Sequence, residues 1–342
     1  MVGVVIGLIA VLIIYQVFAA AEGIKRNTTS VGDAQQNGLL SSFMLGIELA
    51  NAGNGVASAA RDLGVCPGGA DFASTWRPIP VMIVDGRGAN RPDSFMVNYS
   101  VSNAAIAPAP FTNVPAAAAN EDYKVQSPTG FQAGDLIVAI SSAVCVASKV
   151  TAVSSADGLG IVTISHTNPG STGTFGSGAV LFDMGPAASA QKVRYDVSSA
   201  GVLRSTALLK GDGTPNDDTS PPPNPLASNV VNMKLQYGLD TNNDGVLEWV
   251  SAATSPWTPP ELLSGIPANN LIAQLKTLRA VRIGIVVQGE QCDRDAPDVS
   301  WSLFGGTANG GYEGTFPRAN GNYRYRTYET VIPVRNQLWN SV

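Results

Sequence analysis

Residues 1–21 read MVGVVIGLIAVLIIYQVFAAA and contain no charged side chain. Gln16 is the only amide in this run, and the first charges, Glu22, Lys25 and Arg26, come after it. A helix of about twenty apolar residues crosses the hydrocarbon core of a bilayer. A cleavable secretory signal would need a basic region ahead of the apolar run, and none stands there. We therefore expect a membrane-spanning helix.

The helical pattern continues well past bilayer length. Residues at three- and four-residue steps form one face: Val31, Gln35, Leu39, Leu40, Phe43, Met44, Ile47 and Ala50 or Ala52. This spacing predicts an amphipathic second half that packs the face on a globular head, with Ser41, Ser42 and Glu48 pointing elsewhere. The stretch Asn27 to Ser30 is a poor helix former where we expect a bend, and Asn51 to Gly55 supplies the stop.

The apolar half is expected to contact helices of neighbouring subunits. Gly3 and Gly7 have a small-xxx-small spacing, which lets helix backbones approach closely in a membrane, although chance produces it about as often. The residues expected at this helix contact are Gly3, Gly7, Leu8, Leu12, Tyr15 and Phe18.

Composition limits what the remainder can be. The chain has 342 residues with 36 Gly and 22 Pro, which indicates a loop-rich, β-rich head of one or two domains. Only 14% of residues are charged and the net charge is -5, so no basic face is available for a phosphate backbone. Nucleic acid is therefore excluded as a partner.

The head reads as short strands separated by turns. The expected strands lie at residues 81–84, 95–101, 136–141, 146–153, 161–165, 180–184, 192–197, 202–209, 231–237, 247–250, 281–287 and 323–334, with a short helix at 271–278. The Pro- and Asp-rich stretch 211–223 is expected to be a solvated loop or linker.

The chain resembles the PilW-like minor pilins of type IV pili at both ends and in the middle. The matching phrases are MVGVVIGLIAVLIIYQVF (1–18), DAQQNGLLSSFMLGIELANAG (33–53), GDLIVAISSAVC (134–145), LRAVRIGIVVQ (278–288) and RYRTYETVIPVRNQLW (324–339). In that family a leader peptidase cuts ahead of a Phe-Thr-Leu-type sequence. Met1 matches a methionine just downstream of that site, so processing by the peptidase is an expectation from the resemblance.

The resemblance implies an α+β, type IV pilin-like fold in which the long N-terminal helix packs on an antiparallel β-sheet head with an inserted β subdomain. Residues 1–54 would form the helix, with 1–21 as its membrane or filament-core part. Residues 55–200 would form the first β-rich part of the head, including an inserted subdomain around Asp135 to Cys145. Residues 201–342 would form the C-terminal antiparallel sheet.

One loop has the spacing of a calcium site. Oxygen-bearing residues alternate in Asp240, Asn242 and Asp244, with Gly245 where such a loop turns, and the candidate ligands are Asp240, Asn242, Asp244, the carbonyl of Val246, and Glu248. The twelfth position, where an EF-hand has its bidentate Glu, is Ser251. The alternative is a metal-free Asx-rich hairpin turn between two strands. Both remain open from sequence.

Three cysteines, Cys66, Cys145 and Cys292, lie far apart without a C-x-x-C pair, which argues against a zinc or redox centre. An exported chain would form one disulfide and leave one thiol, but the pairing cannot be read from sequence.

No enzyme is expected. His166 is the only histidine and has no triad around it, so we interpret it as a surface residue. The tryptophans Trp76, Trp249, Trp257, Trp301 and Trp339 are interpreted as core or subunit contacts in preference to a sugar platform.

The sequence thus favours a structural subunit of a type IV pilus, kept in the inner membrane before assembly and then part of the extracellular fibre. By resemblance it would prime assembly beneath a tip adhesin, with other pilin subunits as partners. Composition equally permits a major subunit. A pseudopilin of a type II secretion system and a membrane-anchored binding module are the alternatives.

Overall fold

The structure is a computed structural model that describes residues 2–56, 63–102, 108–112, 118–126, 130–141, 144–171, 173–187, 192–291, 299–316 and 323–334. Its helical elements are α1 (Val2–Asn51), the π-helical turn η1 (Glu261–Gly265), α3 (Ala268–Leu275) and the short 3-10 turn η2 (Thr307–Asn309). The other elements are strands, and all the strand pairs between them are antiparallel. The expected α+β class, with a long N-terminal helix on an antiparallel head, is confirmed.

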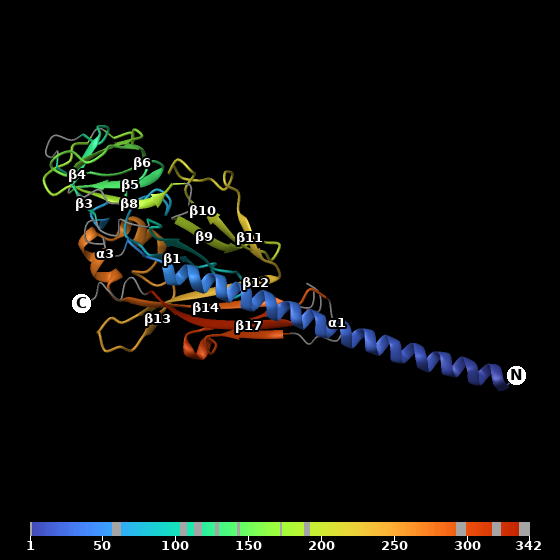
Figure 1. The fold of residues 1–342 in the computed structure, drawn as a ribbon. Helices are drawn as coiled ribbons and strands as arrows, with labels where there is room; N and C mark the ends of the chain where they lie inside the picture. The colour runs from blue at the N-terminus through green and yellow to red at the C-terminus, as the bar shows by residue number, and fades with distance from the viewer. Residues whose placement is uncertain are drawn as a thin grey trace.

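The N-terminal helix is a single rod. At 1.5 Å per residue, its 50 residues span about 75 Å. Figure 1 shows its first half projecting away from the head and its second half lying along it. The bend expected at Asn27 to Ser30 is wrong, because helix runs through that stretch without a break. The stop is confirmed, since α1 ends at Asn51 and Gly53 follows with a φ of 78°.

A five-stranded sheet forms one layer of the head, in the order β1-β2-β9-β10-β11. Its strands are β1 (Val81–Val84), β2 (Ser94–Asn98), β9 (Lys192–Val197), β10 (Leu203–Ala207) and β11 (Asn224–Ala227). Strand β2 pairs directly with β9, and the rings of Phe95 and Tyr195 stack at 5.0 Å. The chain between β2 and β9 is therefore an insertion into this sheet.

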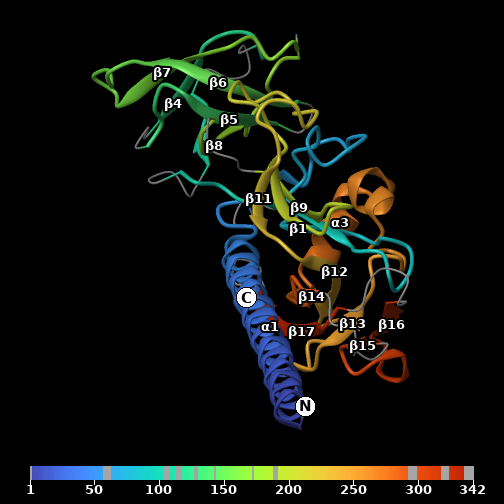
Figure 2. The same cartoon turned by 90° about the vertical axis from the view of Figure 1, so that its right-hand side faces the viewer.

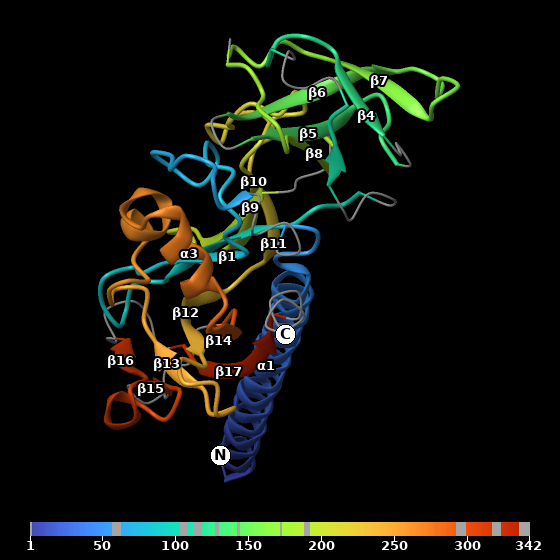
Figure 3. The ribbon, with the colours of Figure 1, turned by 90° about the vertical axis from the view of Figure 1, so that its left-hand side faces the viewer.

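The insertion is a separate six-stranded sheet at the end of the head opposite the N-terminus (Figure 3). Its order is β3-β8-β5-β6-β7-β4, with β3 (Ala109–Pro110), β4 (Tyr123–Gln126), β5 (Asp135–Ile140), β6 (Cys145–Val153), β7 (Ile161–His166) and β8 (Val180–Pro186). The two edge strands meet, because Phe111 bridges Val125 and the Thr112 N–H donates to the Lys124 carbonyl at 2.7 Å. The sheet thus closes into a small barrel, filled by rings such as Tyr123 and Phe175.

Strand β5 is buried along its whole length because its two faces serve different cores. Ile137 and Ala139 point into the barrel. Leu136, Val138 and Ile140 pack outside it, against Cys66 and neighbouring residues. The placement of this strand in an inserted β subdomain is confirmed.

The second layer of the head is a four-stranded sheet in the order β13-β12-β14-β17 (Figure 2). Its strands are β12 (Val230–Leu239), β13 (Glu248–Val250), β14 (Leu278–Gln288) and β17 (Tyr325–Pro333). One face, with Leu235, Tyr237 and Ile283 among its residues, shares a core with α1 and the five-stranded sheet. On the other face Gly284 leaves room for Leu303, whose side chain would lie 2.8 Å from an added Cβ.

The hairpin that covers this outer face consists of β15 (Val299–Leu303) and β16 (Tyr312–Phe316). Leu303 and Phe304 pack on Val286 there, in a cluster of their own.

Helix end, five-stranded sheet and barrel meet at one joint. The Gly53 N–H donates to the Asn98 carbonyl at 2.8 Å, and the Ser100 N–H donates to the Asn54 carbonyl at 2.8 Å. The Ser100 hydroxyl then donates to the Asp183 carbonyl in β8 at 3.1 Å. The helix is thereby fastened to both β units.

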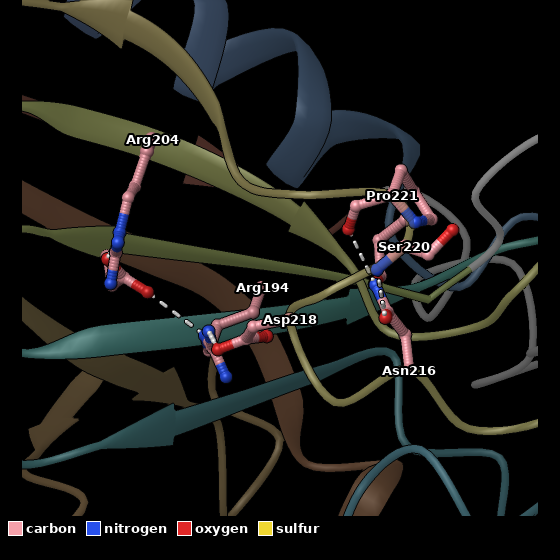
Figure 4. A network of polar contacts seen from close by, with 8 residues as sticks. Arg194, Arg204, Asn216, Asp218, Ser220 and Pro221 are labelled. Carbon is pink, nitrogen blue, oxygen red and sulfur yellow. Dashed lines mark hydrogen bonds and ion pairs between the residues drawn. The ribbon is translucent and has the colours of Figure 1, made fainter.

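The stretch 211–223 is not a free linker. Arg194 of β9 binds Asp218 at 2.6 Å, and the Asn216 amide donates to the Ala207 and Pro221 carbonyls at 2.7 and 2.9 Å (Figure 4). The expectation that the acids of this stretch are simply solvated is wrong for Asp218, because Arg194 on the central strand of the sheet pairs with it. The boundary drawn from sequence after residue 200 falls in the turn between the paired strands β9 and β10.

Candidate functional site

The apolar half of α1 is exposed throughout. Every residue described from Val2 to Thr29 lies open to the surroundings, apart from Asn27, whose side chain is not described. Among the described helices α1 is the one long and apolar enough to cross a membrane. The predicted contact residues Leu8, Leu12, Tyr15 and Phe18 lie on this open surface, and at Gly3 and Gly7 nothing approaches within 4 Å of an added Cβ. Their role in helix packing stays a prediction.

The exposed apolar surface continues on the half of α1 that packs on the head. Leu39 is 63% exposed and Phe43 is 67% exposed, and Leu40 and Ile47 are also open. The sequence pattern predicted that these residues face the head, and that prediction is wrong. The residues that the head covers are Ser30, Ala34, Gly38, Ser41, Leu45, Leu49 and Ala52.

Small residues explain which face the helix buries. At Gly38 an added Cβ would lie 2.0 Å from the ring of Tyr328 in β17, so only glycine lets the helix lie this close to the strand. The Tyr328 hydroxyl donates to the Ala34 carbonyl at 3.5 Å one turn away. Large apolar side chains at the level of Tyr328 would hold the helix off the sheet, so Leu39, Leu40 and Phe43 lie on the exposed face, while Leu45 and Leu49 enter the core further along the helix.

Polar contacts fix how the helix is rotated on the head. The Tyr99 hydroxyl donates to the Glu48 carboxylate at 3.1 Å. Burial, with the Glu48 charge beside it, raises the pKa of Tyr99, so the hydroxyl keeps its proton. At the other end of the contact the Gln291 N–H donates to the Ser30 hydroxyl at 3.4 Å. These contacts hold Phe43 and its neighbours outward.

The outward face carries few charges. Glu22 and Arg26 form an exposed pair at 2.7 Å at the end of the apolar half. The remaining acids of α1, Asp33 and Glu48, are partly covered. From Gln35 to Ile47 the open positions are therefore amides and large apolar side chains.

The predicted calcium loop makes the contacts of an Asx turn. The Val246 N–H donates to Asp244 Oδ1 at 2.7 Å, the Asp244 N–H donates to Asn242 Oδ1 at 3.3 Å, and the Asn242 amide donates to Asp244 Oδ2 at 2.9 Å. Glu248 accepts from the Thr241 hydroxyl at 3.1 Å. Asn242 and Asp244 are thus engaged with donors of the loop itself, whereas Asp240 Oδ1 is buried without a hydrogen-bond partner among the described residues.

A protein cation already lies beside this loop. Arg279 Nε is 3.7 Å from Asp240 Oδ2, and Arg279 Nη2 donates to Asn243 Oδ1 at 3.2 Å. In the described part of the chain no three His, Cys, Asp or Glu side chains converge as a metal site would require. The calcium ligands therefore stay a prediction beside the metal-free turn.

Cys66 and Cys145 form a disulfide, with their Cα atoms 5.3 Å apart. It ties the chain just after the helix to the first residue of β6 in the barrel. Cys292 lies outside the described residues. The disulfide predicted from sequence is present, and the structure supplies the pairing that sequence could not.

Two buried lysines were missed by sequence reasoning, because nothing local marks them as buried. Lys192 Nζ donates to the carbonyls of Phe72, Ala73 and Thr75 and lies 3.9 Å from the Trp76 ring centroid. Burial lowers the pKa of this ammonium to about 7.

The other is Lys234, which binds Asp93 at 2.7 Å with both side chains sealed from solvent. Asp93 also accepts the N–H groups of Gly86 and Leu235. Both lysines hold separate segments of the chain together.

His166 ends β7 and stacks on Tyr123 at 4.0 Å. Its Nε2 contacts the Glu121 carbonyl at 2.8 Å, which is a structural contact at the mouth of the barrel. Trp257 and Trp301 are buried, as predicted, Trp76 and Trp249 are partly buried, and Trp339 lies outside the described residues.

The comparison with protein families agrees with the C-terminal half of the head. Residues 194–336 match the family model described as Type IV Pilus-assembly protein W, PilW. This match covers strands β9 to β17, which include the whole four-stranded sheet on which α1 lies. Neither a curated protein nor a solved structure matches the chain.

Proposed function

We propose that this chain is a PilW-like structural subunit of a type IV pilus that polymerises through α1, because residues 194–336 match the PilW family model. Its work is packing and not catalysis. The subunit is held in the inner membrane by the apolar half of α1, and it enters the fibre when that helix moves from lipid into a bundle with other subunits.

The observation that carries the proposal is the position of Leu39, Phe43 and Ile47. Phe43 is 22 residues beyond Ala21, where the apolar run ends, which is about 33 Å along the helix. That is far outside the hydrocarbon core. A plain membrane anchor has no use for an apolar face so far from the bilayer, whereas a helix that packs against other helices over its whole length needs one.

The second half of α1 should contribute more free energy to the contact between subunits than the apolar first half. The apolar half leaves lipid when it enters a bundle, so its burial gains little from the hydrophobic effect. Leu39, Leu40, Phe43 and Ile47 leave water. Scaled by their exposure, their burial is worth roughly 3 to 6 kcal/mol per subunit.

The finer role follows the resemblance to minor pilins. In that role the subunit primes assembly with a few partner subunits beneath a tip adhesin, and most of the fibre consists of another pilin. The disulfide and the barrel joint keep the head one connected body after it leaves the cell envelope, which a minor and a major subunit both need.

Quantitative mass spectrometry of fibres sheared from cells tests the proposal. The expected result is a trace of this chain beside an abundant pilin. Recovery as the dominant species would make it the main building block. Its absence from fibres that otherwise form normally would overturn the pilus role and favour an envelope-bound pseudopilin or anchor.

A further inference from the structure

A hollow of about 340 Å³ lies on the outer face of the four-stranded sheet. Its lining residues are Trp249, Arg282, Phe304, Glu329, Thr330 and Val331. Arg282 alternates along β14 with Val281 and Ile283, which belong to the core shared with α1. The hollow therefore opens on the side of the sheet that faces away from this core, and contacts made by the exposed face of α1 do not use it.

The sheet is shaped to hold the aromatic wall of this hollow. At Gly238 of β12 an added Cβ would lie 2.7 Å from the Trp249 ring, so the absence of a side chain lets the indole lie across the strand. Arg282 sits between two rings, with its guanidinium carbon 4.7 Å from the Trp249 centroid and 4.4 Å from the Phe304 centroid. Such stacking holds the guanidinium flat.

The amide of Gln236 fixes the orientation of the Arg282 guanidinium in its plane. Arg282 Nε donates to Gln236 Oε1 at 2.7 Å, and Nη2 donates to the same oxygen. The Gln236 amide is itself fixed, since it donates to the Gly310 carbonyl at 2.8 Å. Nη1 takes part in neither bond to Gln236, so it supplies the N–H donors at the hollow.

Glu329 supplies the matching acceptor. Its Oε1 accepts the Phe304 N–H at 2.8 Å, which fixes the carboxylate and leaves Oε2 outside that bond. The charges of Arg282 and Glu329 oppose each other, so the lining is neutral overall. A bound anion would be attracted by Arg282 but repelled by Glu329, and a bound cation the reverse. For either ion the attraction and the repulsion would be of similar size, so the hollow favours neither.

We propose that this hollow binds a neutral saccharide unit. Neighbouring hydroxyls of a sugar offer an acceptor to Arg282 Nη1 and a donor to Glu329 Oε2, while the apolar face of the ring packs on the Trp249 indole. The volume lies at the small end of the range for ligand sites, which suits one or two rings. The sequence interpretation of Trp249 as a core or subunit contact would then need correction.

The test uses the full chain in detergent micelles and saturation-transfer NMR. The probes are methyl β-D-galactopyranoside, methyl α-D-mannopyranoside and N-acetyl-D-glucosamine, with acetate and methylammonium as charged probes. Val331→Trp fills the hollow from its rim. Leu159→Trp is the matched control, because both side chains are exposed, at 53% for Val331 and 77% for Leu159, and Leu159 lies in the connection between β6 and β7 of the barrel.

We expect at least one saccharide to bind saturably and neither charged probe to bind. Val331→Trp and Glu329→Gln should each weaken binding about tenfold or more, since Gln keeps the acceptor for Phe304 but removes a charged hydrogen-bond partner. Leu159→Trp should bind as the wild type does. The melting temperature of each variant shows that the head is folded.

The proposal is overturned if none of the three saccharides binds. In that case, loss of the Val331→Trp chain from fibres would assign the hollow to a contact between subunits. Binding of a charged probe in place of the saccharides, or equal weakening of binding by both tryptophan variants, would also overturn it. None of these results bears on the helix contact, which Val331 does not touch.

Discussion

Phe43→Ser tests the reversed orientation of the helix face most sharply. Phe43 is 67% exposed on the isolated subunit, so its replacement removes no head contact and should leave the melting temperature of the head within about 1 °C. In a helix bundle the same ring is buried. Two-thirds of a buried phenylalanine is worth about 1 to 2 kcal/mol, which corresponds to a factor of about 5 to 30 in incorporation.

The assay is the ratio of variant to wild-type chain in sheared fibres when both are made in the same cells. Leu159→Ser is the matched control, because Leu159 is 77% exposed at the tip of a barrel hairpin. It should incorporate as the wild type does. Leu45→Ala is the opposite control, since Leu45 is sealed against the head, and it should destabilise the head by about 2 to 5 kcal/mol. Equal incorporation of Phe43→Ser and wild type, or a large loss of head stability in that variant, would refute the orientation.

Four further results are expected. Gly38→Val should lower the melting temperature and raise protease cleavage of α1, because its side chain displaces Tyr328 at a cost of about 1 to 3 kcal/mol; an unchanged melting temperature would contradict the close approach. Cys66→Ser should cost about 4.5 kcal/mol in urea unfolding by loop entropy over the 79-residue separation; a loss below about 1 kcal/mol would show that the bridge adds little. Burial raises the pKa of Asp183 from 3.8 to about 6, so between these values the native state binds the proton that the unfolded chain has lost, and stability falls as pH rises through this window. Asp183→Asn should remove that slope, worth up to about 3 kcal/mol, and a slope that survives the change must come from another group. Millimolar calcium followed by a chelator should leave the melting temperature unchanged if the 240–248 loop is an Asx turn; a rise of several degrees with calcium would restore the metal site.

Long strands in which apolar and polar residues alternate were predictable from sequence. The sequences of β12 and β14 alternate between two kinds of residue. Apolar residues of one face are buried in the core with α1, and the other face carries polar residues such as Gln236 and Arg282. Strand β5 was placed partly through the family resemblance, since a strand buried on both faces has no alternation to detect. The hairpin β15–β16 was missed because its burial depends on Gly284 in a distant strand.

The face of α1 could not be chosen from its own residues. Its second half carries two stripes of comparable period, one large and apolar and one made mostly of small residues. Hydrophobicity favours the first stripe for the head, but the close approach of Tyr328 to Gly38 selects the second. Only the partner surface decides between them, so the more hydrophobic stripe stays exposed on the subunit.

The candidate sites show the same limit. The disulfide needed two segments to meet, and the cysteine count alone left three pairings. The calcium spacing was visible locally, but Arg279, which lies beside the loop, comes from a strand more than thirty residues later. Trp249, Arg282 and Phe304 likewise come from three segments, and no spacing in the sequence announces their stack.

Photo-crosslinking from position 43 in assembled fibres tests the central claim most directly. A photoreactive residue in place of Phe43 should link this chain to the N-terminal helix of another pilin subunit in sheared fibres, while the same residue at Leu159 should give no such product. If position 43 crosslinks only to lipid in the membrane fraction, or only within its own head, the exposed face of α1 is not the contact that builds the fibre.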